Sequence, residues 1–172
     1  HAMQMGLDLE TINGTYFKGY AEWIPSGLLG RGLAQYRTPF AEWPAEIQKY
    51  YQYDPEGAGK LLDEAGYPLN DDGIRFKTTF EVWEGRDIGY FELAVAYWSA
   101  IGVEVELMPL EGATHVANIH NHTFEGLVGG ELGFDTSNPI GLYKALLYTG
   151  GTWNRPNVSD PMLDKMIDDA AA

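Results

Sequence analysis

The hydrophobic pattern changes its period twice between positions 74 and 110, and this stretch predicts the centre of the fold. Side chains alternate between two faces over residues 74–82, which is the two-residue repeat of a strand. Over residues 91–101 the apolar positions recur at helical spacing, and Gly102 is a typical helix stop. A second alternating segment occupies residues 103–107. Strand, helix and strand over this length indicate a right-handed crossover between parallel strands. We therefore expect an α/β fold with a mixed β-sheet flanked by helices.

The segment 53–68 carries the clearest local signal, a helix with both ends marked. Asp54 is a favourable N-cap, Pro55 suits the first helical position, and Gly66 is typical of a helix C-terminus. The apolar positions between these ends form a single stripe, namely Ala58, Leu61, Leu62 and Ala65. We expect this helix to have a structural role.

A third, buried strand is expected at 124–130, where Leu127 and Val128 are apolar. The loop 131–137 then lies at the carboxyl end of this strand, before a helix that begins at 138. Ligands of α/β sheets bind beyond the carboxyl ends of the strands. This loop and the segment 83–86, which follows the first strand, are therefore predicted to share one edge of the sheet.

The long segment 14–52 is rich in glycine, proline and aromatic residues and forms a loop region without regular periodicity. Loops of this length are functional or docked on another part of the protein. Its rings are more often anchors to the protein's own core than ligand contacts; they are Tyr20, Trp23, Tyr36, Phe40 and Trp43.

Both ends of the chain look cut from something longer. A helical pattern over residues 2–13 starts without a capping residue. The last helix, which Ser159 or Asp160 caps, runs to Ala172 without a stop signal. We expect residues 1–172 to form a single α/β lobe excised from a larger protein.

Composition narrows the possible functions. The apolar content of 45% excludes a disordered chain, and no apolar run is long enough to cross a membrane. The net charge is −14, from 25 acidic and 11 basic side chains, which argues against nucleic acid or an anionic membrane as partner. There is no cysteine, and the sequence contains no phosphate loop, dinucleotide fingerprint or nucleophile elbow. We therefore expect no cofactor and no enzymatic activity.

Three histidines give the one spacing that suggests a metal. His115, His120 and His122 lie on and just after an expected helix, 113–121, whose buried side would carry Val116 and Ile119. A metal-dependent hydrolase centred on these histidines is one alternative function. The simpler interpretation is that they are helix-surface histidines, and we favour it. A structural or docking domain, whose aromatic loop meets a partner, is another alternative.

The order of these elements resembles the second lobe of the family 5 extracellular solute-binding proteins, the peptide- and oligopeptide-binding components of ABC importers. The resemblance covers nearly the whole chain and is carried by scaffold motifs at 53–56, 61–68, 101–107 and 160–164. It implies one lobe of a type II periplasmic-binding-protein-like fold, located outside the cytoplasmic membrane. Such a protein closes on a peptide or similar small solute and passes it to a membrane permease. Peptide, sugar, nickel-complex and opine ligands all occur on this scaffold, so the resemblance does not name the solute.

The resemblance also points to ligand-binding residues. In peptide-binding relatives an aspartate in the loop after the third strand receives the ligand's α-amino group, and alignment on Asn138-Pro139 places Asp135 there. Glu131 stands where relatives often carry a tryptophan, which changes the expected pocket shape.

Sheet geometry independently places Trp83 and Arg86 at the same edge. Trp83 is a candidate apolar or cation-stacking wall, and Arg86 could meet a carboxylate. Structural alternatives remain open for three of the candidates. Asp135 could bond its own backbone, Trp83 could be a core residue on the strand's other face, and Arg86 could be a solvated loop charge.

Overall fold

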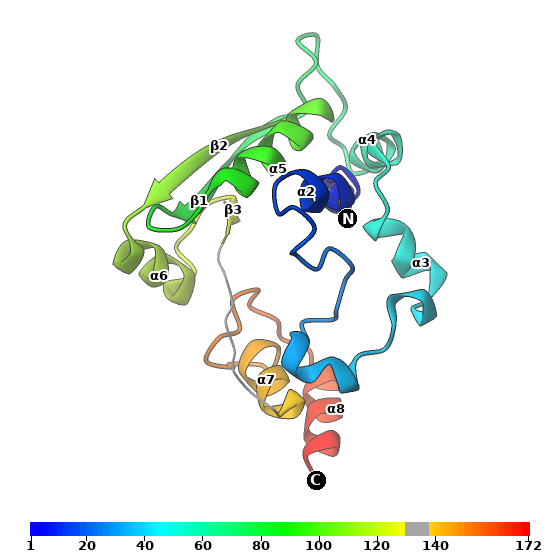
Figure 1. Cartoon of the computed structure of the whole chain (residues 1–172). Helices are drawn as coiled ribbons and strands as arrows, with labels where there is room; N and C mark the ends of the chain where they lie inside the picture. The colour runs from blue at the N-terminus through cyan, green and yellow to red at the C-terminus, as the bar shows by residue number, and fades with distance from the viewer. Residues whose placement is uncertain (130–137) are drawn as a thin grey trace.

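The computed structural model of the chain describes residues 1–129 and 138–172. In Figure 1 the sheet, with α5 and α6, lies on one side, and α7 and α8 lie together at the lower end. In chain order the elements are α1 (Ala2–Met5), α2 (Leu9–Thr15), the 3₁₀ helices η1 (Arg31–Tyr36) and η2 (Phe40–Glu42), α3 (Ala45–Gln48), the 3₁₀ helix η3 (Lys49–Tyr51), α4 (Pro55–Glu64), β1 (Phe76–Trp83), α5 (Gly89–Ala100), β2 (Val103–Leu110), α6 (Gly112–Asn121), β3 (Leu127–Val128), α7 (Pro139–Leu146) and α8 (Pro161–Ala171).

The sheet has the order β2-β1-β3, with β1 in the centre and parallel to both neighbours. The expected crossover is confirmed, because β1, α5 and β2 follow one another and β1 pairs with β2 along its whole length. The strands described are all parallel, so no antiparallel member of the expected mixed sheet is seen among them. Among the described residues of the expected strand 124–130, only Leu127 and Val128 pair, opposite Phe80 and Glu81. The carboxyl ends of β1 and β3 therefore open onto one edge, as predicted.

One face of the sheet is covered by α5 and by the amino-terminal helices. Phe80 and Val82 of β1 are buried against Trp98 of α5, and the ring centroids of Phe80 and Trp98 are 5.7 Å apart. The indole Nε1 of Trp98 donates a hydrogen bond of 2.8 Å to the carbonyl of Met3, which holds α1 on this core. The core thus fixes the sheet that carries the functional edge.

The single helix expected over residues 2–13 was wrong. The chain forms two helices, α1 and α2, and Asp8 between them is an N-cap that was not predicted. The Asp8 carboxylate accepts a hydrogen bond of 2.9 Å from the backbone N–H of Thr11, which starts α2. The predicted caps of α4 are confirmed: Asp54 accepts from the N–H of Gly57 at 2.8 Å, and Gly66 has φ +88° just past the helix end.

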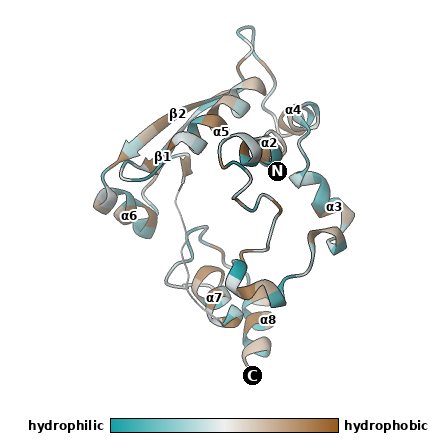
Figure 2. Cartoon of the chain, in the orientation of Figure 1, coloured by the Kyte–Doolittle hydropathy of each residue, from teal (hydrophilic) through white to brown (hydrophobic). Residues whose placement is uncertain are grey.

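The segment 14–52 contains short helical turns, and its anchor differs from the one expected. Leu29 and Leu33 are buried in a second small core with Leu142 and Leu146 of α7, a largely hydrophobic helix in Figure 2. Of the five rings expected to anchor this segment, Phe40 and Trp43 contact each other and Tyr51. The other three are partly or mostly exposed, namely Tyr20, Trp23 and Tyr36. Leu29 and Leu33, and not the five rings expected, therefore dock the middle of this segment on α7.

Candidate functional site

A cavity of about 120 Å³ lies at the carboxyl edge of the sheet. Segments from five parts of the chain meet there: the end of β1, the start of α5, α6, the residue after β3, and the connection between α7 and α8. The lining residues are Trp83, Arg86, Tyr90, Phe91, His115, Val116, Ile119, Gly129, Trp153 and Arg155. This is the edge at which ligands of parallel α/β sheets bind.

Trp83 and Arg86 lie together in this lining, as the sequence predicted for the edge. The guanidinium carbon of Arg86 is 4.6 Å from the centre of the Trp83 ring, so the cation stacks on the indole. Gly112, at the start of α6, passes close over the same ring, since a Cβ built there would lie 2.6 Å from the indole Nε1. The glycine is therefore required for α6 to approach β1 at the cavity. The ligand-binding role of both residues stays a prediction.

The loop after β1 is held by a contact with α2. The Tyr16 hydroxyl donates a hydrogen bond of 2.5 Å to the carboxylate of Asp87, which also accepts from the N–H of Gly89. This hydrogen bond to the Asp87 carboxylate raises the pKa of Tyr16 to about 12. The same bond, with the Gly89 N–H, lowers the pKa of Asp87. This contact fixes the course of the loop that carries Arg86 after the end of β1.

Asp135 and Glu131 lie outside the described residues. The chain is described up to Gly129, whose N–H donates a 2.8 Å hydrogen bond to the carbonyl of Glu81 at the cavity edge. It is described again from Asn138, whose side chain caps α7 as predicted. The roles expected of Asp135 and Glu131 stay predictions.

The three histidines have separate environments. His115 is 2% exposed and lines the cavity, so the interpretation of it as a helix-surface residue was wrong. His120 packs its ring 4.9 Å from that of Trp153, and Nε2 of His122 lies 3.3 Å from the carbonyl oxygen of Asn154. In the described part of the chain, no group of three or more histidine and acidic residues is arranged to hold a metal ion. The geometry does not favour the hydrolase alternative.

The orientation of α6 explains the error at His115. Ile119 is buried as expected, but Val116 is 42% exposed, and His115 takes the inward position instead. Asn118 on the same helix donates a hydrogen bond of 2.9 Å to the buried carboxylate of Glu81 on β1. This polar contact fixes the helix rotation, which apolar spacing alone did not reveal.

His115 is unusual because neither ring nitrogen makes a well-formed hydrogen bond with the described residues, although the backbone of Gly129 lies close enough to raise the pKa of the ring against the effect of burial. Its burial lowers the pKa of the imidazole, so the ring is neutral at neutral pH. A neutral imidazole offers one N–H donor and one acceptor nitrogen. The cavity thus contains a hydrogen-bond donor and an acceptor that the described protein residues do not satisfy.

Trp153 and Arg155 were not among the residues predicted for the site, although both line the cavity. The Arg155 guanidinium carbon lies 5.3 Å from the centre of the Trp153 ring, and its buried Nε has no hydrogen-bond partner among the described residues. Desolvation lowers the pKa of this arginine. A sequence signal was present, because an arginine two residues after a tryptophan stands out in the glycine- and asparagine-rich connection of an acidic chain. Only the fold, however, brings it to the sheet edge.

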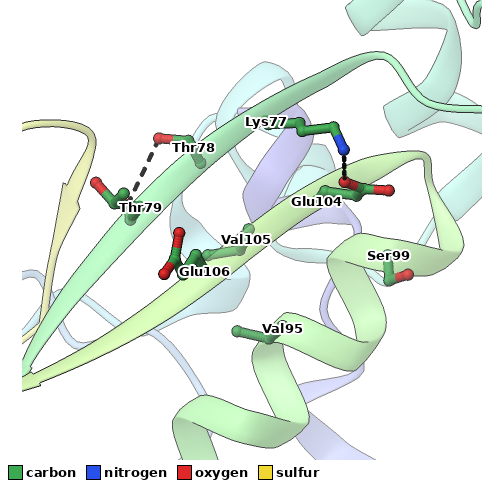
Figure 3. A pocket seen from close by; sticks show the side chains of 8 residues that line it. All are labelled: Lys77, Thr78, Thr79, Val95, Ser99, Glu104, Val105 and Glu106. Atoms are coloured by element: carbon green, nitrogen blue, oxygen red, sulfur yellow. Dashed lines mark hydrogen bonds and ion pairs between the residues drawn. The ribbon is translucent and has the colours of Figure 1, made fainter.

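A larger and more open hollow of about 590 Å³ lies elsewhere, over the amino-terminal halves of β1 and β2 (Figure 3). Its polar rim carries an ion pair of 2.5 Å between Lys77 and Glu104, whose side chains are 71% and 44% exposed. Water screens such a pair, and ligands of parallel sheets bind at the opposite strand ends. We therefore assign the site to the smaller cavity.

Several solved binding proteins contain a part with the same fold as this chain. A periplasmic oligopeptide-binding protein of an ABC transporter from Thermotoga maritima, solved with mannohexaose, is 21% identical over 97% of this chain, with a TM-score of 0.78. The periplasmic binding protein DppA from Helicobacter pylori, in complex with the peptide STSA, is 18% identical over 98%, with a TM-score of 0.76. NikZ from Campylobacter jejuni, in complex with Ni(L-His), is 16% identical over 98%, with a TM-score of 0.71.

The chain spans about a third of each of these proteins, covering 34%, 31% and 34% of their lengths, respectively. The likeness identifies the fold as one lobe of a type II periplasmic-binding fold. No curated protein sequence matches the chain at a significant level.

The family itself is shown by the sequence. The profile of the bacterial extracellular solute-binding proteins, family 5 Middle, matches residues 1–154, which is most of the 172-residue chain. This agrees with the order of the elements along the chain. The chain belongs to family 5 of the bacterial extracellular solute-binding proteins.

Proposed function

We propose that this chain forms one wall of a solute-binding cleft and captures peptides or similar small solutes for import by an ABC permease. The observation that carries the proposal is the cavity at the carboxyl edge of the sheet, which is lined by aromatic rings, by two arginines and by His115, whose ring nitrogens have no hydrogen-bond partner among the described residues. Apolar walls with a few converging polar groups are typical of small-molecule sites. No chemical step is part of the proposed function.

The similar structures support this function and its place in the cell. They are binding proteins, and they were solved with an oligosaccharide, a peptide and a nickel–histidine complex, respectively. The family is described as extracellular, so we place the whole protein outside the cytoplasmic membrane, where its partner is the permease. None of the described helices is long and apolar enough to cross a membrane.

Within the site we propose that Asp135 receives the α-amino group of a peptide. A carboxylate and an ammonium group attract each other more strongly when little water surrounds them. Trp83 would then form an apolar wall, with Arg86 and Glu131 at its rim. Closure of the second lobe over this edge would exclude water, so the isolated lobe should bind weakly.

The test is mass spectrometry of solutes that co-purify with the full-length two-lobed protein, compared between the wild type and Asp135→Ala. The matched control is Asp71→Ala, which removes an exposed carboxylate from the turn between α4 and β1. We expect the wild type and the control to retain the same solute and Asp135→Ala to lose it. Equal retention in all three proteins would remove Asp135 from the site. A wild-type protein that neither retains a solute nor binds added peptides would contradict the proposed function.

A further inference from the structure

Two buried polar groups from distant parts of the chain line the same cavity without hydrogen-bond partners among the described residues. One is the imidazole of His115 on α6, and the other is the Nε–H of Arg155 in the connection between α7 and α8. Buried polar groups are normally hydrogen-bonded, because leaving them unsatisfied costs stability. Two such groups at one cavity indicate that a partner comes from outside the described chain, and a ligand is the natural source in a binding protein.

The positions of both groups are fixed by the surrounding structure. Glu111 caps α6 by accepting hydrogen bonds from the N–H groups of Ala113 and Thr114, directly before His115. Asn154, next to Arg155, is buried, and its side chain bonds three backbone groups of its own loop. Donors held in place before binding lose little freedom when a ligand arrives.

The charge of the cavity favours an anion. Arg155 carries a positive charge, and among the described residues no carboxylate lies within ion-pair distance of it. Arg86 also lines the cavity, where its guanidinium stacks on the ring of Trp83, so the positive charge that favours an anion is that of Arg155. Glu81 is near enough to raise the pKa of His115, but its carboxylate is bonded to Asn118 and it does not line the cavity. A neutral His115 contributes an N–H donor that a carboxylate oxygen can accept.

The volume limits the size of the occupant. A cavity of about 120 Å³ exceeds the roughly 10–15 Å³ that one water molecule needs and is close to the roughly 150 Å³ cavity known to hold a benzene molecule. It therefore has room for one side chain. The rings of Trp83, Phe91 and Trp153 provide apolar walls for the aliphatic part of that side chain.

We propose that this cavity is a subsite for an acidic side chain of the captured peptide, with Arg155 and His115 donating to its carboxylate. The inference rests on the proposed function and deepens it by naming the ligand chemistry. A site of this kind makes a strongly acidic protein selective for one anionic group at one place, while the net charge of −14 repels anions elsewhere.

The test uses the full-length two-lobed protein and a set of tripeptides derived from Ala-Ala-Ala. Each position in turn is replaced by Glu, Gln or Leu, and affinities are measured by isothermal titration calorimetry at neutral pH. We expect Glu at one position to bind at least about tenfold more tightly than Gln or Leu at that position, because a charge-assisted hydrogen bond replaces a neutral or apolar contact. In Arg155→Gln this preference should fall to about twofold or less.

Two further variants keep the result interpretable. His115→Leu should also weaken the preference for Glu. It replaces Arg155→Gln as the test variant if circular dichroism shows that Arg155→Gln does not fold. Arg31→Gln, which removes an exposed arginine of η1, should keep the preference. Equal binding of the Glu, Gln and Leu peptides at every position would overturn this inference and leave the proposed function standing. A preference that survives Arg155→Gln and His115→Leu would overturn it as well. Failure of every tripeptide to bind would contradict both proposals.

Discussion

Asn154 holds the loop that brings Trp153 and Arg155 to the cavity, so its replacement tests how the site is built. Its side chain makes three hydrogen bonds within the loop. Nδ2 donates to the carbonyls of Tyr148 at 3.0 Å and Val158 at 2.7 Å, and Oδ1 accepts from the N–H of Val158 at 2.8 Å. The residue is only 6% exposed, so water replaces these bonds poorly.

The expected effect of Asn154→Ala follows from these three bonds. Each contributes about 1 kcal/mol net, and bonds that share one side chain are not fully additive, so the loop should lose about 2–3 kcal/mol. This loss corresponds to a roughly 30- to 150-fold larger opening constant. Asn154→Asp has nearly the same shape but turns a carboxylate oxygen toward two carbonyl oxygens, so its effect should be at least as large.

Hydrogen exchange followed by mass spectrometry on the full-length protein measures this opening locally, in peptides that cover residues 148–158. Thr152→Ala, an exposed change in the same loop, is the control and should leave the exchange rates unchanged. If exchange in Asn154→Ala stays within threefold of the wild type, the side-chain bonds do not hold the loop, and the account of how Arg155 is positioned is refuted.

Three further predictions concern the sheet and the edge that carries the site. Phe80→Ala should lower the free energy of unfolding by about 3–5 kcal/mol in urea denaturation, because the ring is buried between two aromatic neighbours; a loss below 1 kcal/mol would show that it does not hold this core. Gly126→Ala should destabilise the protein clearly more than Gly150→Ala. Both glycines have positive φ, but only at position 126 would the new Cβ lie 2.6 Å from a backbone carbonyl oxygen of β1. Equal shifts of the melting temperature in the two variants would contradict this close approach. The folded-state pKa of Asp87 is lowered, so the contribution of this carboxylate to stability is present above the unfolded pKa of about 3.9 and is lost as the pH falls through the folded value. Tyr16→Phe should reduce this pH dependence when the unfolding midpoint is measured over an acid titration. An unchanged profile would show that the hydrogen bond from Tyr16 does not cause it.

Local signals in the sequence predicted the framework well. The crossover was visible because its period changes from two to helical and back within about three residues of the points where β1, α5 and β2 begin and end. Asp54 and Asn138 mark the starts of α4 and α7, because capping depends only on residues a few positions apart. The edge of the sheet that carries the site followed from strand direction alone.

The lining of the cavity was only partly predictable, because it depends on contacts between distant segments. Trp83 is the last residue of β1 and Arg86 lies three residues further on, so the direction of the strand alone places both at this edge of the sheet. His115 faces inward because Asn118 reaches Glu81, a contact across 37 positions that no helical pattern encodes. Arg155 reaches the site through the fold of a loop that has no periodicity. The tertiary contacts of α6 and of that loop therefore determine the rest of the cavity lining.

The small core formed by Leu29 and Leu33 with α7 has a consequence for how the chain folds. It joins segments that are far apart along the chain, as does the hydrogen bond of 3.4 Å from the Tyr143 hydroxyl to the carbonyl of Gly27, across 116 positions. Contacts of such long sequence separation form slowly, since the entropy of loop closure is lost before any packing is gained. The crossover unit can nucleate early from neighbouring residues, whereas this junction has to wait until the intervening polypeptide has collapsed.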